Sequence, residues 1–189
     1  MFKRLALATA LTLSMSVSAL AASYTIDTKG AHASINFRKL HFNFSFLTGR
    51  FDTFSGKFDF DPENPEAGSV SLEIDTNSLN TNHAERDNHL RSEDFFEVSA
   101  HPKATFVSTS IKKTGEKTAI ITGDLTIRNI TKSIDLDATY IGGGEDPWGN
   151  TRQGFSATTS FSPADFGMPH GAAKGTVELS VEAEGILDK

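Results

Sequence analysis

The sequence contains no cysteine, which excludes disulfide bonds as a source of stability. Small extracellular domains commonly use disulfides to offset a thin hydrophobic core. A chain without them must be held together by side-chain burial alone, and 189 residues are enough for one domain with its own core. The absence of thiolates also removes the soft ligands that most structural zinc sites use.

Long apolar runs are absent beyond Leu20. Residues 1–21 combine a basic head at Lys3 and Arg4, an apolar run to Leu20 and a small-x-small ending, which is typical of a cleavable secretory signal. A membrane anchor is the alternative, but Ser and Thr dilute the run too strongly for a stable span. We therefore expect a signal peptide over residues 1–21, an exported domain over 22–189 and no membrane span.

Basic residues are fewer than acidic ones, with 18 Lys and Arg against 24 Asp and Glu. Removal of Lys3 and Arg4 with the signal changes the formal net charge from −6 to −8, because 16 basic residues then face 24 acidic ones. An acidic chain is repelled by phosphate-rich partners. The charge balance therefore disfavours nucleic acid and anionic membrane surfaces as partners.

Familiar catalytic motifs are missing as well. The sequence has no nucleophile elbow, no phosphate-binding loop and no H-E-x-x-H helix. The polar cluster that includes His83, Asp87 and His89 could supply acid and base groups to an enzyme that acts on a quinone or lipid headgroup. His83 and His89 are six residues apart, which is not one face of a helix, so the cluster is a poor metal site. We predict no catalytic residues and no metal ligands.

Phenylalanine is abundant, and seven of the fifteen lie between residues 42 and 60. Phe42, Phe44 and Phe46 occupy alternate positions, and Phe54, Phe58 and Phe60 continue the even phase, so these strands are expected to have one aromatic face directed inward. The remaining chain predicts eight or nine strands joined by short turns. This pattern favours an all-β, eight-stranded antiparallel barrel, with a two-sheet sandwich as the alternative.

Period-two alternation is interrupted once, between Asn80 and Val98. The spacing there fits a helix, so we predict a short helical insertion at about residues 82–97. Beyond it, Pro163 cannot donate to a strand ladder, and the strand that reaches it should end or bulge there.

Two interpretations of the barrel interior remain open from the residues alone. The rings could pack into an ordinary core, or they could surround an apolar chamber, since eight-stranded barrels occur in both filled and hollow forms. Trp148, in a glycine-rich loop, could close one end of such a chamber or anchor its own loop.

Several motifs resemble the YceI family. They are the run from Thr81 to Phe96, the segment His101–Phe106, Tyr24–Asp27 with His32, Gly123–Ile127 with Thr131, and Asp146-Pro147-Trp148-Gly149. The resemblance covers nearly the whole mature chain. It implies a periplasmic, lipocalin-like barrel that binds a long isoprenoid lipid, such as an isoprenoid quinone or a polyprenyl phosphate, without a required cofactor. Some members are dimers, so a homodimer is a further expectation.

With this resemblance a hollow interior becomes the favoured interpretation. The residues then predicted to contact the lipid or to lie at the chamber mouth are Phe37, Phe42, Phe44, Phe46, Phe54, Phe58, Phe60, Phe106, Phe155, Phe161, Trp148, Arg86 and His89.

Overall fold

The computed structural model describes residues 21–168 and 175–189. The predicted signal peptide therefore lies outside the described residues, except for Ala21. In chain order the elements are β1 (Ala22–Ile26), β2 (Ser34–His41), β3 (Ser45–Phe51), β4 (Phe54–Phe60), η1 (Pro65–Ala67), β5 (Ser69–Asp75), η2 (Thr76–Ser78), β6 (Leu79–Asn80), α1 (Ala84–Arg91), β7 (Lys103–Lys113), β8 (Thr118–Ile127), β9 (Ile130–Glu145), β10 (Thr151–Phe161), η3 (Pro163–Phe166) and β11 (Val177–Leu187).

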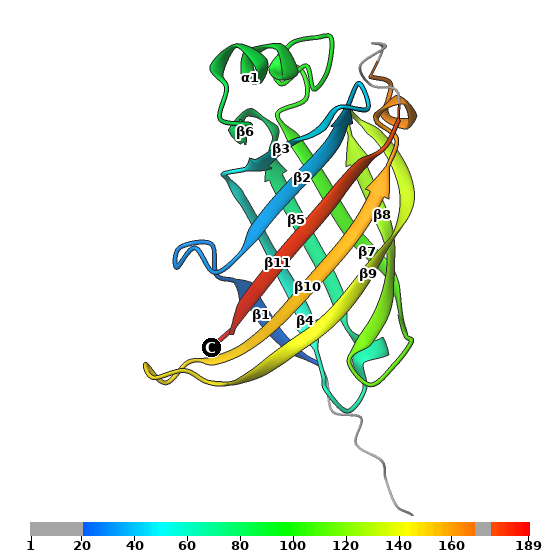
Figure 1. Ribbon diagram of the computed structural model, residues 1–189. Coiled ribbons are helices and arrows are strands. Elements are labelled where there is room, and N and C mark those ends of the chain that lie inside the picture. Colours follow the sequence, from blue (N-terminus) through cyan, green and yellow to red (C-terminus); the bar gives the residue numbers. More distant parts are fainter. Residues whose placement is uncertain (1–20, 169–174) are drawn as a thin grey trace, which may run out of the picture.

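The strands close into a barrel (Figure 1). Eight of the described strands pair in the order β1-β4-β5-β7-β8-β9-β10-β11, and β11 pairs with β1 again to complete the circle. Every pairing is antiparallel. The predicted eight-stranded antiparallel barrel is confirmed, and closure leaves no unpaired edge between these strands.

Two further strands share the wall of the barrel with β1 and β4. The C-terminal end of β11 pairs with β1, and residues 177–182 of β11 pair with β2. β1 and β2 are therefore two successive segments that occupy the same place in the strand order. β3 continues into β4 in the same way, and the short β6 pairs with β3 beyond the end of β5. Long strands that tilt across the barrel therefore reach from one end of the molecule to the other (Figure 1).

The inward phase changes between β3 and β4. Phe51 is buried and Phe54 is half-buried inside the barrel, which is a spacing of three where strict alternation gives two. Instead of joining the regular ladder, the NH groups of Asp52 and Thr53 donate to Ser78, to its carbonyl at 3.1 Å and its hydroxyl at 2.9 Å. One extra residue at such an irregularity reverses which side chains point inward.

This phase change makes part of the sequence prediction wrong. Phe54, Phe58 and Phe60 point inward on β4, but on β3 the inward positions are odd. Phe42, Phe44 and Phe46 are therefore on the outside, with 76%, 87% and 49% of their surface exposed.

The one α-helix in the part of the chain that the structure describes is shorter than predicted. α1 spans Ala84–Arg91, and turns occupy most of residues 92–100. His83 caps it, because its Nδ1 accepts from the NH of Arg86 at 3.2 Å. The helix lies over one end of the barrel (Figure 1). Within residues 21–168 and 175–189, no helix is long and apolar enough to cross a membrane.

The strand that reaches Pro163 ends as expected. β10 stops at Phe161, and Pro163 begins η3, which is closed by Gly167 at a φ of 69°. Phe166 in η3 is fully buried and packs edge-on against Phe161 at 5.3 Å.

Candidate functional site: two apolar cavities inside the barrel

The larger internal cavity lies toward the end of the barrel that carries the β7–β8 turn. It has a volume of about 300 Å³, and most of its wall is apolar. Inward side chains of β4, β5, β8, β9, β10 and β11 line it, including Phe58, Phe60, Leu72, Tyr140, Phe155 and Ala157. Small residues at the inward positions Ala138, Ala157 and Ala183 leave this space between the rings. We call it the lower cavity.

A second cavity of about 110 Å³ lies toward the opposite end, beneath α1 and the turns that follow it. Its walls come from β2, β3, β5, β7, β8, β10 and β11, with Phe37, Phe161 and Leu179 among the lining residues. Leu90 of α1, with Phe95 and Phe96, covers it. We call it the upper cavity.

Phe106 lies between the two cavities. Its cross-strand partners are Leu72, which lines the lower cavity, and Leu125, which lines the upper one. The ring is 3% exposed and covers Gly123 so closely that a β-carbon at that glycine would overlap it. Phe54 packs against the core clusters at both ends. The two rings therefore form a waist that divides the interior.

Lys39 is the one charged side chain among the described residues that line the upper cavity. It shares the inward face of β2 with Ile35 and Phe37. Desolvation by burial lowers the pKa of this amine from its ordinary value, because burial disfavours the charged form. The sequence analysis did not identify Lys39, although the period-two spacing from Ile35 and Phe37 places it on the inner face.

The structure divides the predicted aromatic residues into three groups. Phe37 and Phe161 line the upper cavity, and Phe58, Phe60 and Phe155 line the lower one. Phe54 and Phe106 pack between the cavities. Phe42, Phe44 and Phe46 lie outside, as described above. The predicted lining is therefore correct in orientation for seven of these ten rings, and lipid contact remains a prediction for all of them.

Trp148 does not close either cavity in the described part of the chain. It is 77% exposed in the turn of the β9–β10 hairpin, which projects beyond the barrel wall (Figure 1). Asp146 organises this turn, since its Oδ1 accepts from the NH groups of Trp148 at 2.9 Å and Asn150 at 2.8 Å. Trp148 is thus part of a structured hairpin tip.

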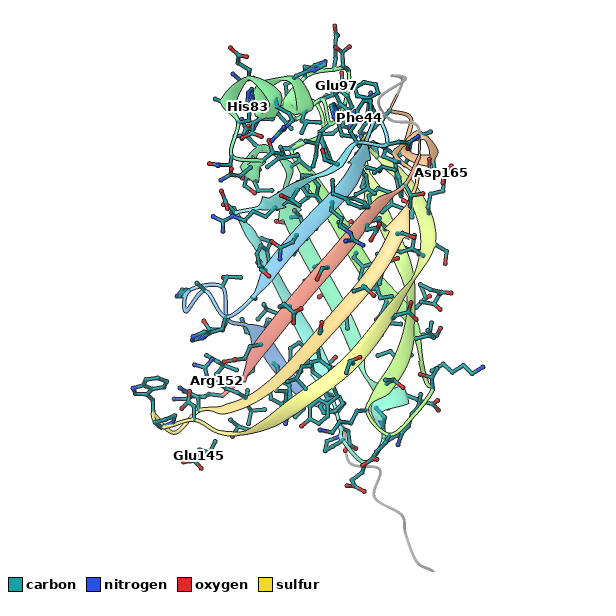
Figure 2. The ribbon with its side chains drawn as sticks, viewed as in Figure 1. Phe44, His83, Glu97, Glu145, Arg152 and Asp165 are labelled. Atoms are coloured by element: carbon teal, nitrogen blue, oxygen red, sulfur yellow. The ribbon has the colours of Figure 1, made fainter. Side chains whose placement is uncertain are left out.

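Arg152 joins that hairpin to the barrel. Its guanidinium donates to Asp146 at 2.6 Å, to Asp27 at 2.8 Å and to Glu184 at 2.6 Å. His32 lies 3.1 Å from the same Asp27 carboxylate. Figure 2 shows Arg152 near Glu145, at the end of the molecule away from His83. Three segments far apart in sequence, residues 27–32, 146–152 and Glu184, therefore meet at one arginine.

The charges of this cluster stabilise one another. The hydrogen bond from Arg152 is the main reason that the pKa of Asp27 falls to about 2. Burial acts to raise the pKa of Asp146, but hydrogen bonds from Arg152 and Asn150 hold it well below its usual range. The two aspartates in turn raise the pKa of Arg152. Asp27, His32 and Glu184 are the one group of three potential metal ligands found in the described residues, and the Arg152 cation already occupies their carboxylates.

The predicted mouth residues on α1 have structural partners instead. Arg86 donates to the hydroxyl and carbonyl oxygens of Thr81, both at 2.8 Å. His89 lies 3.2 Å from Asp94 and packs edge-on against Phe95. Neither side chain is among the described residues that line the two cavities, and a headgroup contact by either stays a prediction.

The three groups of the alternative enzyme hypothesis do not converge. His83 caps α1, Asp87 accepts from the NH and hydroxyl of Thr81, and His89 faces Asp94. Asp87 is 7% exposed and is therefore a structural anchor of the helix. The sequence could not reveal these partners, because two of the four are backbone NH groups and the other two are brought close by the local fold.

A closed eight-stranded antiparallel barrel with apolar cavities along its interior defines a lipocalin-like fold. The family model of the YceI-like domain matches residues 24–185. The chain belongs to the YceI family, as its motifs indicated. A UPF0312 protein of Ectopseudomonas mendocina is 52% identical over 170 residues, which cover 89% of each chain. One of Vibrio parahaemolyticus is 45% identical over 177 residues, which cover 94% of each.

Solved structures have the same fold. The YceI protein of Campylobacter jejuni is 30% identical with a TM-score of 0.73, over 79% of this chain and 90% of that one. BcnA of Burkholderia cenocepacia is 23% identical with a TM-score of 0.75, over 84% and 98%. A domain from Saccharophagus degradans, described as polyisoprenoid binding, is 18% identical with a TM-score of 0.65, over 88% and 99%.

Proposed function

We propose that this protein is a non-enzymatic periplasmic carrier that holds the tail of an isoprenoid lipid, a quinone or a polyprenyl phosphate, inside its barrel. The observation that carries the proposal is the pair of apolar cavities on either side of Phe106. The polyisoprenoid binding described for the Saccharophagus degradans domain supports the same ligand class. The secretory character of residues 1–21 supports the compartment.

The energetics of such binding are favourable. Burial of ten methylene groups contributes about 8 kcal/mol before the costs of association are subtracted. The lower cavity, at about 300 Å³, is at the small end of the range of about 300–1,000 Å³ for ligand pockets. A long tail therefore requires both cavities, with the Phe106 ring turned aside.

The direct test is recovery of lipid from protein purified without detergent, by native mass spectrometry and solvent extraction. We expect a one-to-one complex with an isoprenoid lipid, or uptake of one when short and long polyprenyl lipids are added to empty protein. Repeated recovery of an empty barrel that takes up neither would overturn the proposal.

A cavity-filling variant localises the binding. Ala157→Phe places a ring in the lower cavity and should abolish uptake of long tails, whereas Thr158→Phe changes the exposed face of the same strand and should leave uptake unchanged. Circular dichroism must show both variants folded, since overpacking can cost about 1–3 kcal/mol. Equal uptake by the two variants would place the lipid elsewhere.

A further inference from the structure

The turn between β2 and β3 holds a phenylalanine in a backbone conformation that phenylalanine rarely adopts. The NH of Phe44 donates to the carbonyl of His41 at 2.9 Å, and the two central residues, Phe42 and Asn43, have φ values of 48° and 62°. This is the geometry of a type I′ turn, which favours Asn and Gly at both central positions. Asn at position 42 would serve the fold better, so the strain at Phe42 points to a role for its ring.

The same hairpin exposes an apolar surface. We define the hairpin tip as Leu40, Phe42, Phe44 and Phe46, of which 44%, 76%, 87% and 49% are exposed. Leu40 and Phe46 are direct cross-strand partners on the outer face of the hairpin. Four large apolar side chains within seven residues form a patch of the kind that marks an interaction site, whereas single exposed residues do not.

The hairpin tip lies at the end of the barrel that contains the upper cavity. Phe37 and Lys39, which line that cavity, precede the tip directly on β2. Figure 2 shows Phe44 at the same end as His83, Glu97 and Asp165, opposite Arg152. Any binding partner of the hairpin tip therefore also lies close to the upper cavity.

The charges of the hairpin differ from those of the whole chain. Residues 34–51 include Arg38, Lys39 and Arg50 but no acidic residue, although acidic residues outnumber basic ones in the protein. Arg38 stacks over the Phe46 ring at 4.6 Å and pairs with Glu178 at 2.6 Å, and Arg50 pairs with Asp52 at 2.6 Å. Exposed aromatic rings, one of them covered by an arginine, are typical of surfaces that sit in a lipid headgroup layer. Both arginines are paired with carboxylates and Lys39 points inward, so the apolar side chains, and not a net positive charge, carry the contact with the bilayer.

We propose that the hairpin tip inserts into the headgroup region of a phospholipid bilayer and brings the end of the barrel that holds the upper cavity to the membrane. The rings enter the apolar boundary of the headgroup layer. The proposal rests on the carrier function, since docking provides the route by which a membrane lipid is loaded or released. It commits to the bilayer as the occupant of the tip.

The test uses the mature chain, residues 22–189, and vesicles of phosphatidylethanolamine and phosphatidylglycerol in a flotation assay. Wild type should float with the vesicles, and the double variant Phe42→Asn/Phe44→Ser should bind at least about tenfold more weakly, since each deeply buried ring is worth about that factor. Trp148→Ser removes an equally exposed ring at the opposite end and should bind as wild type does.

The single variant Phe42→Asn separates the role of the ring from the role of the turn, because vesicle binding and thermal stability should change in opposite directions. It should weaken vesicle binding and raise the melting temperature, since Asn tolerates the left-handed conformation that Phe42 is forced to adopt. If the turn at Phe42 served folding alone, Phe42→Asn would leave vesicle binding unchanged.

Three results would overturn the docking proposal. One is a wild-type chain that does not float, and another is flotation lost equally in Trp148→Ser. The third is a tip that mediates self-association, with the wild type dimeric by light scattering, the double variant monomeric and neither bound to vesicles.

Lipid uptake from mixed micelles separates this proposal from the carrier function. Failure of docking leaves micellar uptake intact, and failure of the carrier function removes uptake while docking persists.

Discussion

At the scale of single residues, Lys39 makes the two ends of the barrel interior chemically different, because it places an amine in the wall of the upper cavity. Its lowered pKa reflects burial of a cation, and an anion bound beside it would restore the solvation that it has lost. A polyprenyl phosphate supplies such an anion, whereas a quinone supplies only carbonyl acceptors. We therefore expect a phosphate headgroup at the upper cavity, with the tail directed past Phe106 toward the lower cavity.

Lys39→Met tests this preference, because methionine keeps most of the volume and removes the charge. We expect the affinity for polyprenyl phosphate to fall roughly tenfold, the value of one hydrogen bond to a charged group. The affinity for an isoprenoid quinone should change little. Lys132→Met, at an exposed position of β9 that lines neither of the two cavities, is the control. Titration with both lipids measures the effect, and equal losses for the two lipids would show that Lys39 acts through packing.

Arg152 has a pH-dependent contribution to stability. The pKa of Asp27 is about 2 in the folded protein and about 3.9 in an unfolded chain, so its stabilising contribution is complete above about pH 4 and is lost as the pH falls toward 2. Arg152→Gln should destabilise the protein by about 1–3 kcal/mol at pH 7, because buried carboxylates lose their partner. In urea unfolding the difference from wild type should shrink at about pH 2.5. A difference that is the same at both pH values would contradict the ion-pair explanation.

Individual residues show where prediction from the sequence succeeds. Phe106, Phe155 and Phe161 all point inward as predicted, although the strand registers shift next to Phe155 and shortly after Phe106. The partners of Arg86 and His89 could not be predicted, because Thr81 and Asp94 are brought close to them only by the fold of the loop. Period-two spacing predicts which face of a strand a side chain occupies, but it does not predict which polar groups will form hydrogen bonds with one another.

At the scale of elements, α1 is a cover held mainly by arginines. Arg91 donates to the carbonyls of Asn77, at 2.8 Å, and Leu79. Arg128, in the β8–β9 turn, donates to the carbonyl of Phe95 at 2.7 Å and to Glu97 at 2.9 Å. These contacts hold Leu90, Phe95 and Phe96 over the upper cavity. The cover is therefore attached to the barrel on both sides by charge-assisted hydrogen bonds.

Arg91→Ala should loosen this cover without unfolding the barrel. Loss of hydrogen bonds from a charged donor to backbone carbonyls costs about 1–3 kcal/mol, and the effect should be local. Hydrogen exchange should accelerate in residues 84–96 and remain unchanged in β10. Glu85→Ala, on the exposed side of the same helix, is the matched control. Acceleration throughout the barrel would show that the helix is part of the global folding unit.

Element boundaries also explain the main error of prediction. The even phase of phenylalanines between residues 42 and 60 suggested one continuous aromatic face, but a type I′ turn and the irregularity at Asp52 and Thr53 intervene. The irregularity exists because Ser78, from a distant loop, accepts both NH groups. A local pattern cannot report a contact 25 residues away, so the phase of β3 could not be deduced from sequence alone.

At the scale of the whole molecule, the barrel is neither solid nor fully hollow. Stacked and edge-on rings fill parts of it, such as Tyr24 with Phe58 at 5.1 Å and Phe155 with Phe60 at 5.0 Å. The cavities of about 300 and 110 Å³ remain on either side of the waist at Phe106 and Phe54. The length of lipid that the barrel accepts should therefore depend on how easily the waist opens.

Phe106→Ala removes the ring that covers Gly123 and should join the two cavities. Because the ring is 3% exposed, the substitution should cost about 3–5 kcal/mol of stability. Long polyprenyl tails should nevertheless bind more tightly than they bind wild type, since no ring has to be displaced, while short tails should bind with similar affinity. Phe46→Ala, a half-exposed ring on the outer face, should change neither stability nor uptake from micelles appreciably.

Competition between short and long polyprenyl lipids, followed by native mass spectrometry, measures this preference in one sample. The expected result is a shift toward the long lipid in Phe106→Ala that is absent in Phe46→Ala. An unchanged ratio in a folded Phe106→Ala protein would mean that tails occupy only one cavity, and the waist would then set the depth of the site. Since a lipid that spans both cavities also binds more wall, bound long lipid should recover part of the lost stability, which thermal unfolding with and without lipid can measure.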